Sequence, residues 1–336
     1  MSKPLGKRVF SGIQPTGIPH LGNYLGAIRH WVDIQEGNEC IYCLVDMHAL
    51  TVWQDPAQLR KQVIEQAAIL VAAGIDPQKQ ILFNQSAVSA HARLAWIFNC
   101  VARIGWMNRM TQFKDKAGKN REAHSAGLYV YPNLMAADIL AYKATCVPVG
   151  EDQRQHLELA NDIVQKFNHD YETDFFPEVQ GYIPTTSARV MNLRDGSKKM
   201  SKSDPSEQGR IELMDEDDVI ANKIKRAKSD SEPLPSEKEG LENRLEALNL
   251  VSMYSVMSGK TVDETLQEFA GQGFSGFKTA LADVLIQHIA PIREQTKKLL
   301  SDQAHIHAIL KQGAEKASAI AEPIVSEAEA IVGFIK

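Results

Sequence analysis

Short apolar runs alternate with helix-type patterns along the first half of the chain, and this alternation restricts the fold more than any other feature. Over Ala57–Ala73 the apolar side chains recur at helical spacing, and Gly74 follows as a stop signal. The strand-like runs are Arg8–Ser11, Cys40–Val45, Gln80–Phe83 and Cys146–Val149. Strands that alternate with helices predict an α/β fold with a doubly wound parallel sheet.

The second half of the chain has a different pattern. From about Asn192 onward the strand-like runs end, and segments such as Leu241–Met257 and Phe277–Ile289 carry apolar side chains at helical spacing. A length of 336 residues is enough for two packed domains. We therefore expect an α/β catalytic domain over residues 1–190 and an all-helical domain over residues 191–336.

Composition limits the partners of the chain. The formal net charge of −5 gives no overall attraction for nucleic acid, so an RNA partner needs a local basic surface. One candidate is Met214–Lys228, although its acidic start and basic end also suit an ordinary helix and its dipole. No window approaches the roughly 20 apolar residues that span a bilayer, and no signal-peptide core precedes the first strand. We therefore expect a cytoplasmic protein without a membrane segment.

Two of the four cysteines, Cys40 and Cys43, lie close together in one predicted strand. An odd spacing in a strand places two side chains on opposite faces of the sheet, which argues against both a disulfide and a shared metal. We expect buried thiols and no dedicated metal site.

A glycine-rich loop follows the first predicted strand, at the position where a doubly wound sheet binds phosphate. Gly12, Gly17 and Gly22 allow close approach to the backbone, and the following helix aims its first amides at an anion. Polar contacts can come from Gln14, Thr16, His20 and Asn23. The loop lacks the dinucleotide fingerprint and the Gly-Lys-Ser/Thr ending of a P-loop, so neither a dehydrogenase nor a P-loop ATPase is indicated.

A second motif, Lys198–Asp204, places three lysines among hydroxyl side chains, and the flexible pair Asp195-Gly196 precedes it. Such a cluster of cations can close over a triphosphate. Taken by itself, the segment also fits an ordinary surface loop that is rich in lysine and serine.

Together the two segments resemble the paired nucleotide motifs of class I aminoacyl-tRNA synthetases. The first motif is His20–Asn23 (His-Leu-Gly-Asn), and the second is a complete Lys199–Ser203 (Lys-Met-Ser-Lys-Ser). Along nearly the whole chain the resemblance is to the bacterial-type tryptophanyl enzymes and not to their tyrosyl sisters. The segments that carry it are Ser11–Gly17, Val45–Thr51, Arg109–Lys114, Tyr131–Asp138 and Val147–Gln153. It implies a Rossmann-like catalytic domain onto which the last helix can pack back.

The resemblance also implies the substrates and their sites: ATP, L-tryptophan and tRNA(Trp), bound by a homodimer, with Mg²⁺ carried on the ATP. The implied catalytic residues are Lys199, Lys202, Thr16 and Lys116. The implied ATP-binding residues are Gln14, Pro15, Thr16, His20, Gly22, Asn23, Gly150, Glu151, Asp152, Gln153, Val190, Lys199, Met200, Ser201, Lys202 and Ser203. The implied tryptophan-binding residues are Phe10, Gly12, Gln14, His48, Tyr131, Met135, Asp138, Val147 and Val149.

The residues of one predicted helix add an argument of their own. Tyr131, Met135 and Asp138 stand at positions i, i+4 and i+7, on one face of a helix that we expect to begin near Pro132. Asp138 can accept the single indole N–H, and Met135 offers a polarisable wall to a large aromatic ring. A tyrosyl pocket like that of the sister family would have glutamine at position 135.

The implied reaction needs no protein nucleophile, because the attacking tryptophan carboxylate is already ionised near neutral pH. Three alternatives stay open at this point. They are a tyrosyl-type synthetase, a non-charging paralogue that binds tryptophan, ATP or RNA as a regulator, and a small-molecule nucleotidyltransferase that shares the first motif.

Overall fold

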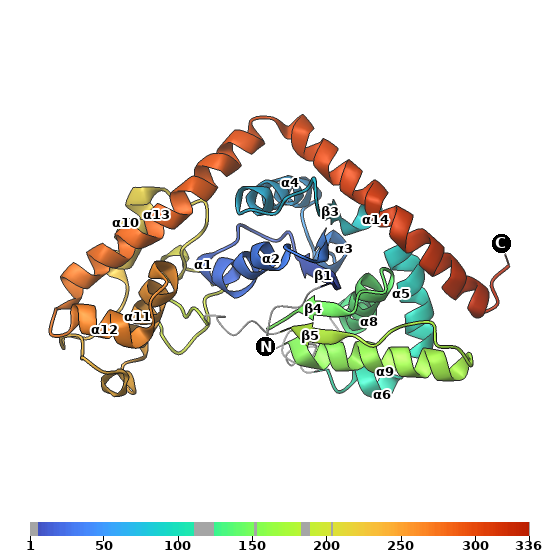
Figure 1. The fold of residues 1–336 in the computed structure, drawn as a ribbon, viewed down its shortest axis with the longest axis horizontal. Helices are drawn as coiled ribbons and strands as arrows, with labels where there is room; N and C mark the ends of the chain where they lie inside the picture. The colour runs from blue at the N-terminus through green and yellow to red at the C-terminus, as the bar shows by residue number, and fades with distance from the viewer. Residues whose placement is uncertain (1–5, 111–123, 151–152, 183–188, 203, 336) are drawn as a thin grey trace.

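Five parallel strands form a single sheet in the computed structural model, which describes residues 6–110, 124–150, 153–182, 189–202 and 204–335. The strands are β1 (Arg8–Ile13), β2 (Glu39–Leu44), β3 (Ile81–Asn84), β4 (Cys146–Pro148) and β5 (Gln180–Tyr182). Their spatial order is β3-β2-β1-β4-β5 (Figure 1). The chain adds strands on one side of β1 and then crosses to the other side, which creates a switch point between β1 and β4.

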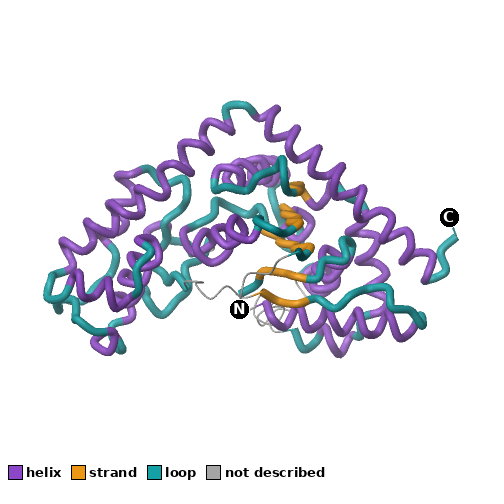
Figure 2. The backbone as a smooth tube through the Cα atoms, viewed as in Figure 1, coloured by secondary structure: helices purple, strands orange, loops and turns teal. Residues whose placement is uncertain are grey.

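Helices surround this sheet and make up most of the second half, where loops connect them (Figure 2). In the first half the helical segments are α1 (Leu21–Asn23), the wide π-type turn η1 (Tyr24–Ile28), α2 (Arg29–Ile34), α3 (Asp46–Ala49), α4 (Pro56–Ala72), η2 (Gln85–Ala87), α5 (Ala90–Val101), α6 (Ile104–Met107), α8 (Ala126–Leu140) and α9 (Arg154–Asp170). In the second half they are η5 (Glu207–Gly209), α10 (Asp217–Arg226), η6 (Lys238–Leu241), α11 (Leu245–Ser258), α12 (Val262–Phe269), α13 (Phe274–Leu300) and α14 (Gln303–Ile331). In the described part of the chain, no helix has the length and apolar character needed to cross a membrane.

The doubly wound α/β fold is confirmed, because all four strand-like runs form strands and both faces of the sheet carry helices. Side chains of β2 alternate between two hydrophobic cores. Cys40 packs in the core with α2 and α4, whereas Cys43 packs in the core with α5 and α8. The sequence did not predict β5, because its three residues include no apolar run and it pairs with the sheet only through β4.

The helix that carries Tyr131, Met135 and Asp138 starts earlier than we expected. The expected start near Pro132 is wrong, because α8 begins at Ala126 and contains Pro132 in its interior. Ser125 caps this earlier start by accepting a hydrogen bond from the Leu128 N–H at 3.3 Å. A proline inside a helix removes one backbone hydrogen bond, and here the burial of the surrounding turns holds the helix together.

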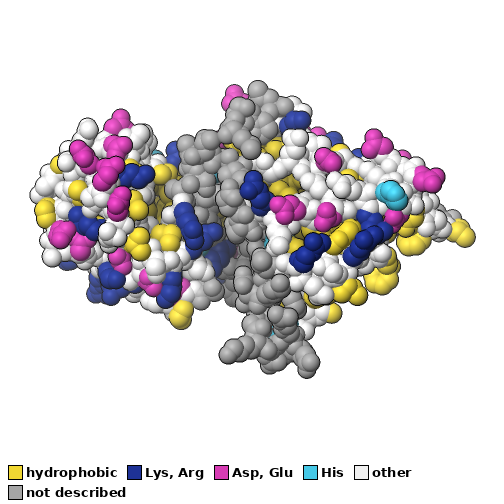
Figure 3. All heavy atoms as spheres, turned by 90° about the horizontal axis from the view of Figure 1, so that it is seen from below, with side chains coloured by type: hydrophobic (Ala, Val, Ile, Leu, Met, Phe, Trp, Pro, Cys, Tyr) yellow, Lys and Arg dark blue, Asp and Glu magenta, His cyan; other side chains and the backbone are white. Residues whose placement is uncertain are grey.

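Helix α10 corresponds to the predicted basic segment Met214–Lys228, but half of its basic end is already neutralised. Lys223 is buried and donates to Asp215 at 2.7 Å, and Lys228 pairs with Glu246 at 2.7 Å. Figure 3 shows Lys and Arg side chains on both halves of one face of the molecule, mixed with Asp and Glu. Basic side chains on this face are therefore not confined to α10.

Two long helices end the chain and form the arch at the top of Figure 1. The first of them, α13, packs on α4, α10 and α11, whereas α14 packs on β3 and α5. Arg93 of α5 donates to both carboxylate oxygens of Glu329 in α14 at 2.7 Å. Helix α14 thereby covers the outer edge of β3, an edge that would otherwise present unpaired backbone groups.

The contact between α14 and β3 is so close that one position tolerates no side chain. A Cβ atom on Gly313 would lie 1.8 Å from the Leu82 carbonyl oxygen. We expect Gly313→Ala to lower the free energy of unfolding by about 1–3 kcal/mol, although alanine normally favours a helix by about 1 kcal/mol over glycine. Urea unfolding measures the change. Gly276→Ala in α13, where a Cβ meets only the Gln272 side chain at 3.9 Å, is the control and is expected to be neutral or stabilising.

Candidate active site

The loop after β1 ends in a pair of reciprocal hydrogen bonds that start α1. The His20 N–H donates to Asn23 Oδ1 at 3.1 Å, and the Asn23 N–H donates to His20 Nδ1 at 3.2 Å. This capping arrangement explains why the first motif ends in asparagine, since the side chain closes the first helical turn. The side-chain amide nitrogen of Asn23, Nδ2, can then donate to a phosphate.

His20 is neutral at physiological pH. Burial, together with the positive charges of Lys202, Arg210 and Lys199, lowers the pKa of His20 to about 4. Because Nδ1 accepts the Asn23 N–H, the single proton of the neutral ring sits on Nε2, which is therefore a donor. A Cβ on Gly22 would lie 3.0 Å from the His20 ring, so glycine at this position lets the ring pack against the helix start.

The second motif is tied to the segment before it by short antiparallel pairing. The Met200 N–H donates to the Val190 carbonyl at 3.1 Å, and the Asn192 N–H donates to the Lys198 carbonyl at 2.8 Å. The side chains of Val190 and Met200 are buried in the core. Neither side chain of these two sequence-predicted ATP contacts is therefore open to a nucleotide in this structure.

Lys202 joins the two motifs. Its Nζ donates to the Gly17 carbonyl at 3.0 Å, across 185 positions of sequence, whereas Lys199 is exposed. Burial of the Lys202 side chain lowers its pKa to about 8, with Glu212 acting in the opposite direction. The structure thus places Lys202 against the loop that holds Thr16.

The lowered pKa of Lys202 is expected to make nucleotide binding sensitive to pH. Bound phosphates favour the ammonium form and raise this pKa above its free value of about 8. ATP binding between about pH 8 and 9 is therefore expected to take up protons, and ATP affinity is expected to fall as the pH rises through this range. Calorimetry in buffers of different ionisation enthalpy measures the uptake, and Lys202→Met is expected to abolish it. No uptake by the unmodified protein would mean that this lysine is not buried before ATP binds.

Asp138 is buried at the centre of a polar network below the carboxyl edge of the sheet. Its Oδ1 lies 2.6 Å from Gln85 Nε2 and 2.7 Å from His91 Nδ1, and its Oδ2 lies 2.8 Å from His48 Nε2. Burial by itself raises the pKa of Asp138, but the nearby His48 and the hydrogen bonds from His48 and His91 outweigh it and hold the pKa below its ordinary value. The carboxylate is therefore ionised.

The predicted face of α8 does assemble around this network. Tyr131 and Asp138 are buried, Met135 is half-buried, and the Tyr131 ring meets the edge of His48 at a centroid distance of 6.0 Å. The Tyr131 hydroxyl lies 2.9 Å from His156 Nε2, at the start of α9.

The remaining predicted residues of this region are distributed over β1, β4 and the turns that follow. On β1, the Phe10 ring stacks on the Tyr142 ring at a centroid distance of 5.8 Å, and a Cβ on Gly12 would touch Val45. Gln14 and Pro15 lie in the loop that follows β1. Val147 is buried, Val149 and Gln153 are half-buried, and Gly150 is exposed. Ser201 is half-buried. Lys116, Glu151, Asp152 and Ser203 lie outside the described residues.

Sequence reasoning missed Gln85, His91 and Tyr142, all of which belong to the Asp138 network. For Gln85 a signal existed, because it directly follows the third strand at the ligand-binding edge of the sheet. His91 and Tyr142 gave none, since a lone histidine in a helix and a tyrosine after one are usually structural.

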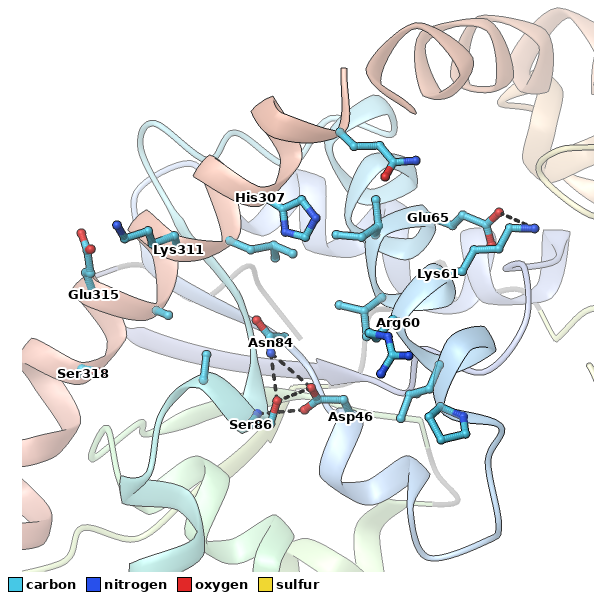
Figure 4. A pocket seen from close by; sticks show the side chains of 18 of the residues that line it. Asp46, Arg60, Lys61, Glu65, Asn84, Ser86, His307, Lys311, Glu315 and Ser318 are labelled. Atoms are coloured by element: carbon cyan, nitrogen blue, oxygen red, sulfur yellow. Dashed lines mark hydrogen bonds and ion pairs between the residues drawn. The ribbon is translucent and has the colours of Figure 1, made fainter. Parts of the chain in front are cut away.

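A large open groove lies behind this network, between α4 and α14, with a volume of about 1470 Å³ (Figure 4). Its inner wall includes Asp46, which accepts hydrogen bonds from the Ser86 N–H at 2.8 Å and from Asn84 Nδ2 at 3.2 Å. None of the predicted tryptophan-binding residues lines it. The short segments α3 and η2 form the wall between the groove and the Asp138 network.

The fold and the site together define a class of protein. The first loop of the parallel sheet carries the His20 motif, and a lysine loop from the second half of the chain reaches that motif. This arrangement is the ATP-binding core of class I aminoacyl-tRNA synthetases.

Similar proteins narrow this class. The family model described as tRNA synthetases class I (W and Y) matches residues 6–290. The tryptophan–tRNA ligase of Brucella melitensis biotype 1 is 54% identical over 353 aligned positions, which cover 99% of each chain. Tryptophanyl-tRNA synthetase from Mycoplasma pneumoniae superposes with a TM-score of 0.87 at 29% identity, covering 98% of this chain and 99% of that chain. The Campylobacter jejuni enzyme, complexed with ADP and tryptophan, superposes with a TM-score of 0.82 at 32% identity, covering 97% and 100%.

The chain belongs to the class I tRNA synthetase family of tryptophan and tyrosine enzymes. Its function is that of a tryptophan–tRNA ligase, as the full-length relatives indicate.

Proposed function

We propose that the chain activates L-tryptophan with ATP at the switch point between β1 and β4 and then transfers it to tRNA(Trp). The tryptophan carboxylate attacks the α-phosphate, the bond to the β-phosphate oxygen breaks, and tryptophanyl-adenylate and pyrophosphate form. No protein base is needed, because the attacking carboxylate is already ionised. The observation that carries the proposal is the 3.0 Å contact between Lys202 Nζ and the Gly17 carbonyl, which holds a cation of the second motif against the phosphate loop.

On the nucleotide side, Lys202 and Lys199 neutralise the negative charge that grows on the leaving pyrophosphate. Thr16 and the Asn23 amide nitrogen donate to the phosphates, and neutral His20 donates through Nε2. The roles proposed for Lys116, Glu151, Asp152 and Ser203 rest on the family resemblance. Mg²⁺ is proposed to arrive on the phosphates with bound water, as is usual for this cation.

On the amino-acid side, Asp138 accepts the indole N–H. Among the described residues, Oδ1 already has two donors, Gln85 and His91, whereas Oδ2 has His48 alone. A carboxylate oxygen has two lone pairs, so one acceptor position on Oδ2 remains for a single further donor. Phenylalanine has no N–H to fill that position, and a site left with an unpaired buried carboxylate lone pair binds such a competitor weakly.

The two halves of the chain are proposed to have different functions. We propose residues 1–190 as the catalytic domain for ATP and tryptophan, and residues 191–336 as the helical domain that binds the tRNA anticodon. The contact of α14 with β3 and α5 supports a last helix that belongs spatially to the catalytic half. The tRNA substrate also supports the expected cytoplasmic location.

We also propose that the chain works as a homodimer. Trp53 and Ile104 are 82% and 73% exposed, which is unusual for large apolar side chains. Both lie beside the first turns of α8, because Ser125 donates to the Thr51 carbonyl at 2.9 Å and Tyr129 donates to the Ile104 carbonyl at 3.4 Å. Two exposed apolar side chains beside the same helix suit an interface with a second copy, and sedimentation velocity measures the assembly state.

The proposal is tested by ATP–pyrophosphate exchange without added tRNA, run in parallel with tryptophan, tyrosine and phenylalanine. Exchange that depends on tryptophan alone is the expected result. Equal exchange with tyrosine would contradict the role of Asp138, and folded protein that exchanges with no amino acid would contradict the proposed activation step.

A further inference from the structure

Two buried side chains that the proposed mechanism does not use, His91 and Tyr142, form a line of hydrogen bonds that ends on Asp138. His91 Nδ1 lies 2.7 Å from Asp138 Oδ1, and His91 Nε2 lies 2.7 Å from the Tyr142 hydroxyl. Both side chains are 0% exposed, His91 in α5 and Tyr142 just beyond the end of α8. Polar atoms in so dry a position need hydrogen-bond partners of the right kind.

The direction of each hydrogen bond follows from the chemistry of the groups. Ionised Asp138 only accepts, so His91 Nδ1 must carry a proton. Burial raises the pKa of Tyr142, so its hydroxyl keeps its proton, and among the described residues this hydroxyl has His91 Nε2 as its hydrogen-bond partner. The Tyr142 O–H therefore donates to Nε2, which leaves His91 neutral with its proton on Nδ1.

This arrangement constrains the Asp138 carboxylate. The terminal torsion of an aspartate is soft, so hydrogen-bond donors set the plane of the carboxylate. Gln85 is itself fixed, because its Oε1 accepts the Met47 N–H at 3.1 Å and its Nε2 must then face Asp138. With Gln85 and His91 both on Oδ1, the carboxylate cannot rotate without losing one of two short bonds.

We propose that His91 is a positioning residue for tryptophan recognition, held by Tyr142 in the Nδ1–H form so that Asp138 turns the free acceptor position of Oδ2 toward an aromatic N–H. This inference rests on the proposed role of Asp138 as the indole acceptor. It predicts that selection for the N–H group depends on a side chain that touches no substrate.

The test compares two substrates that differ in that group. Benzothienylalanine has the size and shape of tryptophan but carries sulfur in place of the N–H. The unmodified protein is expected to favour tryptophan over this analogue by about 10- to 100-fold in kcat/KM for adenylate formation. His91→Leu is expected to reduce this ratio by at least about fivefold, mainly through a higher KM for tryptophan. A merely structural role would lower kcat/KM for both substrates alike and leave the ratio unchanged.

Two further variants sharpen the result. His91→Asn keeps a donor near the position of Nδ1 and is expected to restore the ratio to within about twofold of the original. Phe98→Leu removes packing from the same helix, where Phe98 contacts Phe176, without touching the network, and it is expected to leave the ratio unchanged. A ratio that falls equally in Phe98→Leu, or that His91→Asn fails to restore, would overturn the proposal.

A measurement on the unmodified protein remains decisive if His91→Leu does not fold. Nitrogen NMR of labelled histidine, with the signal assigned through His91→Asn, is expected to show a protonated Nδ1 and an unprotonated Nε2. A proton on Nε2 alone would overturn the proposed role of His91. If the unmodified protein shows no preference for tryptophan over benzothienylalanine, the role of Asp138 itself fails. If that preference exists but survives His91→Leu, only the proposed positioning role of His91 fails.

Discussion

Replacement of Lys202 by alanine is expected to lower the rate of adenylate formation by about 10²- to 10³-fold, the cost of removing one pre-positioned group that stabilises transition-state charge. The Lys202 ammonium already lies 3.0 Å from the Gly17 carbonyl, and it meets negative charge mainly as pyrophosphate leaves. The KM for tryptophan is expected to change little, because this cation acts mostly in the transition state. Stopped-flow measurement of the first turnover separates the two quantities.

Lys198→Ala is the matched control, since it removes the same charge from the same loop. The Lys198 side chain is 74% exposed and pairs with Asp195 at 3.0 Å, away from Gly17. We expect its rate to stay within about threefold of the original, as is usual for an exposed ion pair. Equal losses in both variants would mean that total charge on the loop matters and that the contact of Lys202 does not.

Replacement of Asp138 by asparagine is expected to raise the KM for tryptophan by about 100-fold while the affinity for ATP stays unchanged. Three donors from Gln85, His48 and His91 already point at this carboxylate. An amide NH₂ in its place must face at least one of those donors, and the indole N–H loses a charged acceptor. Equilibrium binding of tryptophan and of ATP, measured separately, tests the expectation.

Asn133→Ala controls for the loss of a buried polar group from the same helix. Asn133 is buried in α8 and donates to Asn99 at 2.8 Å, outside the Asp138 network. It is expected to lower stability without raising the KM for tryptophan selectively. Should Asp138→Asn weaken tryptophan and ATP equally, a general folding defect would explain the loss better than a missing indole acceptor.

Much of the fold could be predicted because its signals are local. The spacing of apolar residues predicts the alternation of strand and helix. Cys40 and Cys43 lie in different hydrophobic cores, as their odd spacing requires. The prediction failed where local signals are weak or compete. The strand β5 has no apolar run, and Pro132 suggested a helix start although Ser125 caps the helix about two turns earlier.

The candidate site divides in the same way. The two motifs could be recognised, because each is a continuous segment whose residue types suit phosphate chemistry. The contact of Lys202 with Gly17 could not be located from the sequence, since it joins positions 185 residues apart. The same holds for the donors around Asp138, which come from α3, η2 and α5 and carry no common pattern.

The sequence by itself determined the class of fold and the two nucleotide motifs and made Asp138 a candidate acceptor, because periodicity and contiguous motifs are properties of neighbouring residues. Only the tertiary structure decided which groups surround that carboxylate, which proton form of His20 is present, and how closely α14 approaches β3. These features depend on burial and on distances between segments far apart in the chain. Burial sets the pKa of an isolated group and the need for a partner, and no single segment of sequence contains that information.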